Sequence, residues 1–119
     1  MLEILPESEG NIVGVKATGT FNHQEFHEFL MPRLREIVKE HGQVRLLFCL
    51  EEDFQGFDLE TIKNEAGGSG LLNDFQKIAV AGGSWLLGLQ MSLIAPLLNG
   101  ALRHFSRAEL PEAWTWIRS

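Results

Sequence analysis

The chain has 119 residues, 45% of them hydrophobic and 22% charged, which is enough to bury one core without a disulfide or a metal. Its net charge of −6 argues against nucleic-acid binding, which needs Lys and Arg to replace phosphate counterions. The same charge argues against long-range attraction to anionic lipid, so any membrane contact would have to be hydrophobic. The single cysteine, Cys49, excludes an internal disulfide and indicates a reducing compartment.

The sequence predicts neither export nor a membrane span. Residues 1–7 contain no basic region followed by an apolar run, as a signal peptide would. The longest apolar run, within residues 85–98, is shorter than the roughly 20 residues of a spanning helix, which leaves a core or interfacial helix. We therefore expect a single domain over residues 1–119, located in the cytoplasm, and peripheral to the membrane if it contacts lipid.

The first part of the chain predicts a hairpin followed by a helix. Residues 2–5 and 11–19 have strand character, and the turn residues between them favour antiparallel pairing. A helix is expected over residues 22–42, beginning at an Asn cap and ending at a Gly. Pro32 should kink this helix, because its ring removes the hydrogen bond to Glu28. The apolar face of the helix consists of Phe26, Leu30, Leu34, Ile37 and Val38.

The rest of the chain predicts strands that alternate with helices. Val44–Leu50 is a nearly continuous apolar run, typical of a central strand covered on both faces. The alternation indicates right-handed crossovers and an α/β fold with a mixed, mostly parallel sheet of four to five strands, an N-terminal antiparallel hairpin and about four helices. The further strands are expected at residues 75–81 and 101–105, and the further helices at residues 59–66, 85–98 and 111–117.

Short segments along almost the whole chain form an ordered pattern. They are Met1–Pro6, Asn11–Val15, Glu40–Gly42, Val44–Leu47, Asn73–Phe75, Lys77–Val80, Trp85, Ala95-Pro96, Arg103, Phe105, Ala108–Leu110 and Glu112–Ile117. In this order they resemble the SpoIIAA-like proteins, a branch of the STAS fold. The resemblance implies a four- or five-stranded mixed sheet surrounded by helices, and no established enzymatic activity. It also implies an interaction or regulatory module, with lipophilic ligands and membrane association through mobile helices.

The chain departs from the anti-sigma-factor antagonists of this fold just after its central strand. Those proteins carry a phosphorylatable serine at a helix start there. Here the segment is Glu51-Glu52-Asp53-Phe54, and the next hydroxyl residue is Thr61. The sequence therefore does not predict phosphorylation at this place.

A second departure lies in residues 85–98, where similar proteins have interspersed charges. A helix on one face of a sheet needs a polar side, yet only Gln90 and Ser92 are polar in this segment. Each large apolar side chain left exposed would forgo roughly 1.5–3 kcal/mol of burial. Three kinds of surface could bury these side chains: another copy of the protein, an apolar ligand or lipid, or the chain's own Gly-rich segment. The simplest alternative is a helix that is well buried in its own domain.

We predict a non-enzymatic STAS-like domain that binds an apolar ligand or a membrane surface through the hydrophobic helix 84–98. The alternative is a homodimeric regulatory or interaction module that uses the same helix as its interface. Expected partners are a lipophilic small molecule or membrane lipid and a second copy of the chain, with no nucleic acid and no cofactor. The candidate ligand, membrane or interface residues are Phe54, Phe57, Trp85, Leu86, Leu89, Met91, Leu93, Ile94 and Leu97. The candidate hinge or flap residues are Gly67, Gly68, Gly70, Gly82 and Gly83.

An acidic loop follows the central strand, where ligands of parallel sheets gather. The carboxylates here, Glu51, Glu52, Asp53 and Asp58, could bind a hard cation or act as acid and base, and a solvated acidic loop is the simpler interpretation. An enzyme that uses Glu51, Asp53 or His104 is the least favoured of the function classes.

The remaining distinctive side chains favour structural roles. His23 and His27 share a helix face but have no obvious third ligand, so no metal site is predicted. Cys49 lies in an apolar strand and is expected to be an inert core thiol. Trp114 and Trp116 are two positions apart on one helix, so one should be in the core and the other partly exposed.

Overall fold

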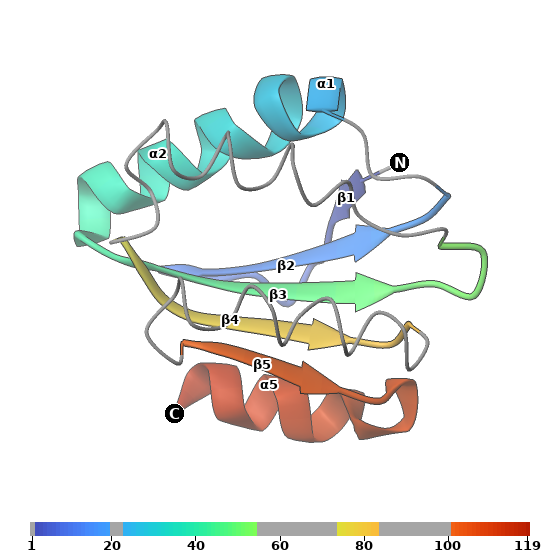
Figure 1. Cartoon of the computed structure of the whole chain (residues 1–119). Helices are drawn as coiled ribbons and strands as arrows, with labels where there is room; N and C mark the ends of the chain where they lie inside the picture. The colour runs from blue at the N-terminus through green and yellow to red at the C-terminus, as the bar shows by residue number, and fades with distance from the viewer. Residues whose placement is uncertain (1, 20–22, 55–73, 84–100) are drawn as a thin grey trace.

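The computed structural model of the chain describes residues 2–19, 23–54, 74–83 and 101–119 (Figure 1). Its five strands form one mixed sheet in the order β1-β2-β3-β4-β5. β1 is antiparallel to β2, and all other neighbours are parallel, which confirms the predicted α/β fold with an N-terminal hairpin. The strands are β1 (Leu2–Ile4), β2 (Ile12–Ala17), β3 (Val44–Leu50), β4 (Phe75–Ala81) and β5 (Leu102–Phe105).

The described helices lie at two places in the chain, before β3 and after β5. Of the four helices predicted, these two are found, whereas residues 59–66 and 85–98 lie outside the described part of the chain. The helical elements are α1 (His23–Glu25), η1 (Phe26–Leu30), α2 (Met31–His41), η4 (Arg107–Glu109) and α5 (Leu110–Arg118).

Pro32 does not end the helix that contains it, but the turn before it is widened. Phe26–Leu30 is a π-helical turn, and regular α-helix begins at Met31, so Pro32 lies in the first turn of α2. Proline is tolerated in the first turn of an α-helix, because an N–H there would have no partner within that helix. The predicted disturbance at Pro32 therefore takes the form of a π turn.

The sheet is covered on both faces, with α2 and α5 on opposite sides (Figure 1). β3 supplies both faces, which explains its nearly continuous apolar sequence. The buried cluster on the α2 side comprises Leu2, Val13, Val15, Ala17, Leu30, Met31, Leu34, Val44, Leu46, Phe48, Leu50, Ile78 and Val80. The buried cluster on the α5 side comprises Leu47, Cys49, Ala79, Ala81, Phe105, Ala113, Trp114 and Ile117.

The two tryptophans of the C-terminal helix lie as the sequence predicts. Trp114 is buried in the α5-side cluster, whereas Trp116 is half-buried and packs at the margin of that cluster. Cys49 is buried in the same cluster, in agreement with the predicted core thiol.

Candidate functional site

Among the five strands that the structure describes, the strand order does not reverse at any point. Open α/β sheets bind ligands in the crevice at such a reversal, at the carboxyl ends of the strands. Here the strands follow one another in chain order, so this topology provides no crevice of that kind. A site at the carboxyl ends of the strands must be built instead from the segments that leave β3, β4 and β5, which we call the carboxyl edge. Its described residues are Leu50–Phe54, Ala81–Gly83 and Phe105–Arg107.

Gly82, directly after β4, is fixed by two hydrogen bonds to β5 and lies close to the end of β3. Its N–H donates to the Phe105 carbonyl oxygen at 2.9 Å, and its own carbonyl oxygen lies 2.7 Å from His104 Nε2. Because a carbonyl oxygen only accepts, Nε2 of His104 is the donor in this bond. Gly82 has φ +107°, and a Cβ here would lie 2.8 Å from the carbonyl oxygen of Leu50. Only glycine fits this position.

Gly83 differs from Gly82 because it is exposed, although its φ of +84° is again in the region that favours glycine. The positive φ angles at both positions thus explain why two glycines follow β4. The structure does not test the predicted hinge role of either residue.

Phe54 lies at the end of the neighbouring strand, β3. Its N–H donates to the Glu51 carbonyl oxygen at 3.0 Å, which closes a turn, and its half-buried ring packs against the α2-side cluster. Since Cys49 on β3 is opposite Ala81 on β4, the fold brings Phe54 and Gly82 to adjacent strand ends. The other predicted site residues lie outside the described part of the chain: Phe57, Gly67, Gly68, Gly70, Trp85, Leu86, Leu89, Met91, Leu93, Ile94 and Leu97.

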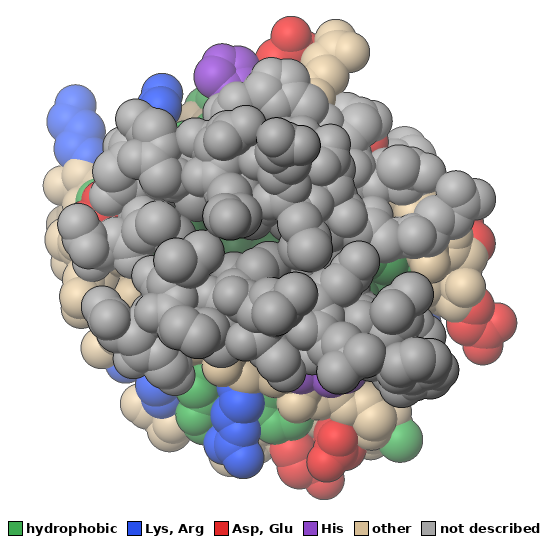
Figure 2. Space-filling view, in the orientation of Figure 1, with side chains coloured by type: hydrophobic (Ala, Val, Ile, Leu, Met, Phe, Trp, Pro, Cys, Tyr) green, Lys and Arg blue, Asp and Glu red, His purple; other side chains and the backbone are tan. Residues whose placement is uncertain are grey.

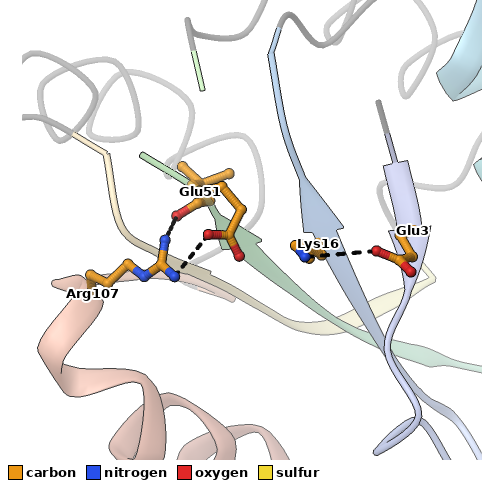
Figure 3. A network of polar contacts seen from close by, with 5 residues as sticks. Glu3, Lys16, Glu51 and Arg107 are labelled. Carbon is orange, nitrogen blue, oxygen red and sulfur yellow. Dashed lines mark hydrogen bonds and ion pairs between the residues drawn. The ribbon is translucent and has the colours of Figure 1, made fainter. Parts of the chain in front are cut away.

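A side-chain clamp that the sequence analysis did not find joins the end of β3 to η4 (Figure 3). Arg107 Nη2 lies 2.8 Å from Glu51 Oε2, and Arg107 Nη1 donates to the Leu50 carbonyl oxygen at 3.0 Å. The hydrogen bond to Glu51 raises the pKa of the Arg107 guanidinium further above its ordinary value. The partners Leu50 and Arg107 are 57 positions apart, and no local pattern in the sequence signals the contact.

Some of the polar groups at and next to the carboxyl edge are engaged in structural contacts. The Glu51 carboxylate is paired with Arg107, and the His104 ring is bound to a backbone carbonyl. Burial raises the pKa of the Cys49 thiol, which keeps it in the unreactive protonated form. Glu52 and Asp53 are exposed, as expected for a solvated loop. The described edge therefore anchors chain segments and presents no activated nucleophile.

The described residues contain neither a cluster of metal-ligating side chains nor a membrane-spanning helix. In residues 2–19, 23–54, 74–83 and 101–119, no group of three or more His, Cys, Asp or Glu side chains is placed to hold a metal ion. Within the same residues, no helix has the length and apolar character needed to cross a bilayer.

An open groove of about 310 Å³ lies at the other end of β2, between α2 and the turn that follows β1. Ile12, Val13 and Ile37 contribute apolar lining, and Glu9 and Glu36 are among its charged residues. None of the residues predicted to form a site lines this groove.

A protein-family model described as SpoIIAA-like matches residues 12–118. The matched range begins at β2 and ends within α5, so it includes the four parallel strands, the carboxyl edge and the segment 84–98. The comparisons with curated proteins and with solved structures give no match.

Proposed function

The chain belongs to the SpoIIAA-like family, and we propose that it is a non-enzymatic domain that binds an apolar ligand or a membrane surface through residues 84–98. The observation that carries this proposal is the composition of residues 85–98, in which only Gln90 and Ser92 are polar. A helix of this composition has no adequate face for water, so a second apolar surface is needed to cover it.

The geometry of the carboxyl edge supports the proposal. Residues 84–98 begin immediately after Gly82 and Gly83, and Gly82 is held through both its N–H and its carbonyl oxygen. If the segment moves to admit a ligand, the pivot is Gly83, which is exposed and has no such bonds in the described structure. Phe54, in the turn that follows the adjacent strand β3, contributes an aromatic side chain that packs against the α2-side cluster.

The non-enzymatic part of the proposal is supported by the engagement of two of the three candidate catalytic side chains, the exception being the exposed Asp53. Glu51 is neutralised by Arg107 at 2.8 Å, and His104 is held by the Gly82 carbonyl oxygen. An acid or base must reach the reacting proton within hydrogen-bond distance, and these two side chains already hold other partners.

The second candidate function is a homodimeric interaction module with the same segment as its interface. The apolar composition of residues 85–98 favours it equally, because a second copy of the chain would cover the same side chains. The two functions differ in what covers the segment, and hence in the mass of the protein in solution.

Leu89→Asp separates the two candidates. A carboxylate in the middle of the apolar segment disfavours its burial against a ligand, a membrane or a second copy of the chain, and the three losses are measured differently. Wild-type protein is mixed with uncharged phosphatidylcholine vesicles and, separately, with an uncharged apolar dye, while native mass spectrometry gives its mass. Under the ligand or membrane proposal, the substitution reduces vesicle flotation and dye binding at least tenfold and leaves the mass unchanged. Under the dimer alternative, it converts a dimer to a monomer.

The matched control is Gln90→Asp, which adds the same charge at a polar position of the same segment. It should retain binding or dimerisation, and circular dichroism should show that both variants are folded. A wild-type protein that is monomeric and binds neither vesicles nor dye would contradict both candidates.

A further inference from the structure

Basic side chains gather on the α5 side of the sheet, near the C-terminal end of α5, in a chain whose net charge is −6. Arg45 on β3 and Lys77 on β4 are register partners, so two like charges stand directly opposite each other. Such a pair is unfavourable unless another group compensates it. Along the lower edge of the space-filling view, where β5 and α5 lie, Lys or Arg side chains lie beside hydrophobic ones (Figure 2).

The charges of Arg45 and Lys77 are compensated by the last turn of α5. Arg45 Nη1 donates to the Ile117 carbonyl oxygen at 2.8 Å, and Lys77 Nζ donates to the Trp116 carbonyl oxygen at 2.9 Å. Carbonyl groups in the last turn of a helix have no partner within the helix and carry partial negative charge. These two cations therefore serve as a cap for α5, and Lys77 also donates to Ser119 Oγ at 2.7 Å.

Arg103 on β5 has no comparable partner. Its guanidinium carbon lies 5.3 Å from the centroid of the Phe105 ring and 5.7 Å from that of Trp116, and these two rings pack against each other with centroids 6.0 Å apart. Within the described part of the chain, Arg103 forms neither an ion pair nor a hydrogen bond, and its side chain is exposed. The two rings thus hold a guanidinium in place while leaving its five N–H donors unused.

Glu109 interacts electrostatically with Arg103, but its carboxylate is engaged elsewhere. Glu109 Oε1 accepts the Ser106 N–H at 2.8 Å, and this bond is the first cause of its lowered pKa, with Arg103 a minor contributor. Lys77 Nζ lies 5.1 Å from the centroid of the Trp116 ring, against which the Arg103 guanidinium also lies. Two cations from adjacent strands therefore share this ring.

We propose that Arg103 and Trp116, flanked by Lys77, form a docking surface for an acidic segment of a partner protein. A guanidinium whose donors have no partner among the described residues can receive a carboxylate through two parallel hydrogen bonds. The half-buried ring of Trp116 provides apolar contact next to that bond, and Arg and Trp are residue types that commonly dominate the binding energy of protein interfaces. The surface contains no residue of the segment 84–98, so it does not depend on the function proposed above.

The small number of available cations favours a protein segment over a membrane or a nucleic acid as the partner of this surface. Binding to anionic lipid through charge needs a cluster of about 4–8 free Lys or Arg, and nucleic acid needs several phosphate contacts. Arg45 and Lys77 are already used by α5, so this surface offers fewer uncommitted cations than either of these partners needs. One free guanidinium beside one aromatic ring matches a single carboxylate with an adjacent apolar side chain.

The test uses the whole chain and a fluorescent peptide rich in Glu that contains one Phe, with a peptide that has Gln in place of Glu as the comparison. Wild-type protein should bind the acidic peptide, and the affinity should fall as salt is added. The peptide should also shift the NMR signal of the Trp116 indole N–H. Arg103→Gln should lower the affinity roughly tenfold, since it removes a bidentate charged contact. Arg103→Lys keeps the charge but not the paired donors and should also bind several-fold more weakly.

The matched control is Arg35→Gln, which makes the same charge change at an exposed position of α2 and should leave the affinity unchanged. Equal losses in Arg103→Gln and Arg35→Gln would show a general charge effect and overturn the proposal. The proposal is also overturned if the wild-type protein does not bind the acidic peptide, or if phosphatidylglycerol vesicles or an oligonucleotide bind more tightly and compete for Arg103. Urea unfolding checks that each variant is folded.

Discussion

Gly14 in β2 shows how one missing side chain admits a large one from another element. A Cβ at this position would lie 2.6 Å from Cη2 of Trp114 and 3.2 Å from Cδ1 of Leu5. Both distances are too short for ordinary van der Waals contact. Glycine at this place in the strand is therefore required by the packing of the buried indole against the sheet.

Gly14→Ala should lower the free energy of unfolding by about 1–3 kcal/mol, because overpacking forces the indole of Trp114 to move. Urea denaturation of the two proteins measures the difference. Adding Trp114→Phe to the variant should recover part of the loss, because the smaller ring leaves room for the methyl group. Equal stability of Gly14→Ala and wild type would mean that the buried ring is loosely packed.

At the scale of elements, the start of the last helix is tied to the central strand by Arg107. Its contacts with Glu51 and with the Leu50 carbonyl oxygen link η4 to the end of β3. The Glu51 side chain is 24% exposed and that of Arg107 47%, so solvent weakens the pair only in part. By comparison, Lys16 and Glu3 on the first two strands are 3.9 Å apart, and the Glu3 side chain is 70% exposed (Figure 3).

Arg107→Gln should lower the free energy of unfolding by about 1 kcal/mol, a value between those of exposed ion pairs and of buried charged hydrogen bonds. Lys16→Gln is the matched control, and its effect should stay within about 0.5 kcal/mol, as for an exposed pair. Both are measured by urea unfolding at low and high salt. If the two substitutions had equal effects, the contact between η4 and β3 would add nothing to stability.

A second link between elements is the capping of α5 by side chains from the sheet. Arg45 and Lys77 reach the last carbonyl oxygens of the helix from β3 and β4. Burial, and then the charge of Arg45, lower the pKa of Lys77. The orientation of α5 on the sheet is thus defined at one end by these hydrogen bonds and at the other by the clamp of Arg107.

At the scale of the whole molecule, the dependence of stability on pH contains two opposed contributions in the alkaline range. Burial raises the pKa of Cys49 above 9.0, so the folded protein keeps a thiol proton that the unfolded chain loses. Stability from this group is present below pH 9.0 and is lost as the pH rises toward the folded pKa. Lys77 acts in the opposite sense, because its lowered pKa makes the unfolded chain the better proton binder just below pH 10.5.

Cys49→Ala isolates the thiol contribution. The free energy of unfolding of the wild type should fall more steeply with pH above 9.0 than that of the variant, and the two curves should run parallel below it. Urea unfolding from pH 7 to pH 10 measures this. As a separate check, iodoacetamide should label the wild-type thiol slowly in the folded state and rapidly in urea. Parallel curves at every pH, or rapid labelling of the folded protein, would contradict a buried, protonated thiol.

Much of the sheet follows from local sequence patterns. The bounds predicted for β3 and β4, at residues 44–50 and 75–81, are those of the structure, because a strand buried on both faces has a continuous apolar sequence and ends at polar or turn residues. The hairpin of β1 and β2 and the α/β class follow from the same local periodicity. The proposed binding segment also follows from composition alone, since it lacks a polar face.

Contacts between distant residues were decided only by the tertiary structure. Nothing near Arg107 in the sequence indicates Glu51 as its partner, and nothing near Gly14 indicates the indole of Trp114. The sequence likewise does not indicate that Arg45 and Lys77 bind carbonyl oxygens of α5 whereas Arg103 does not. Periodicity records which side of an element is buried, whereas such pairings depend on strand register and on how α5 lies across the sheet.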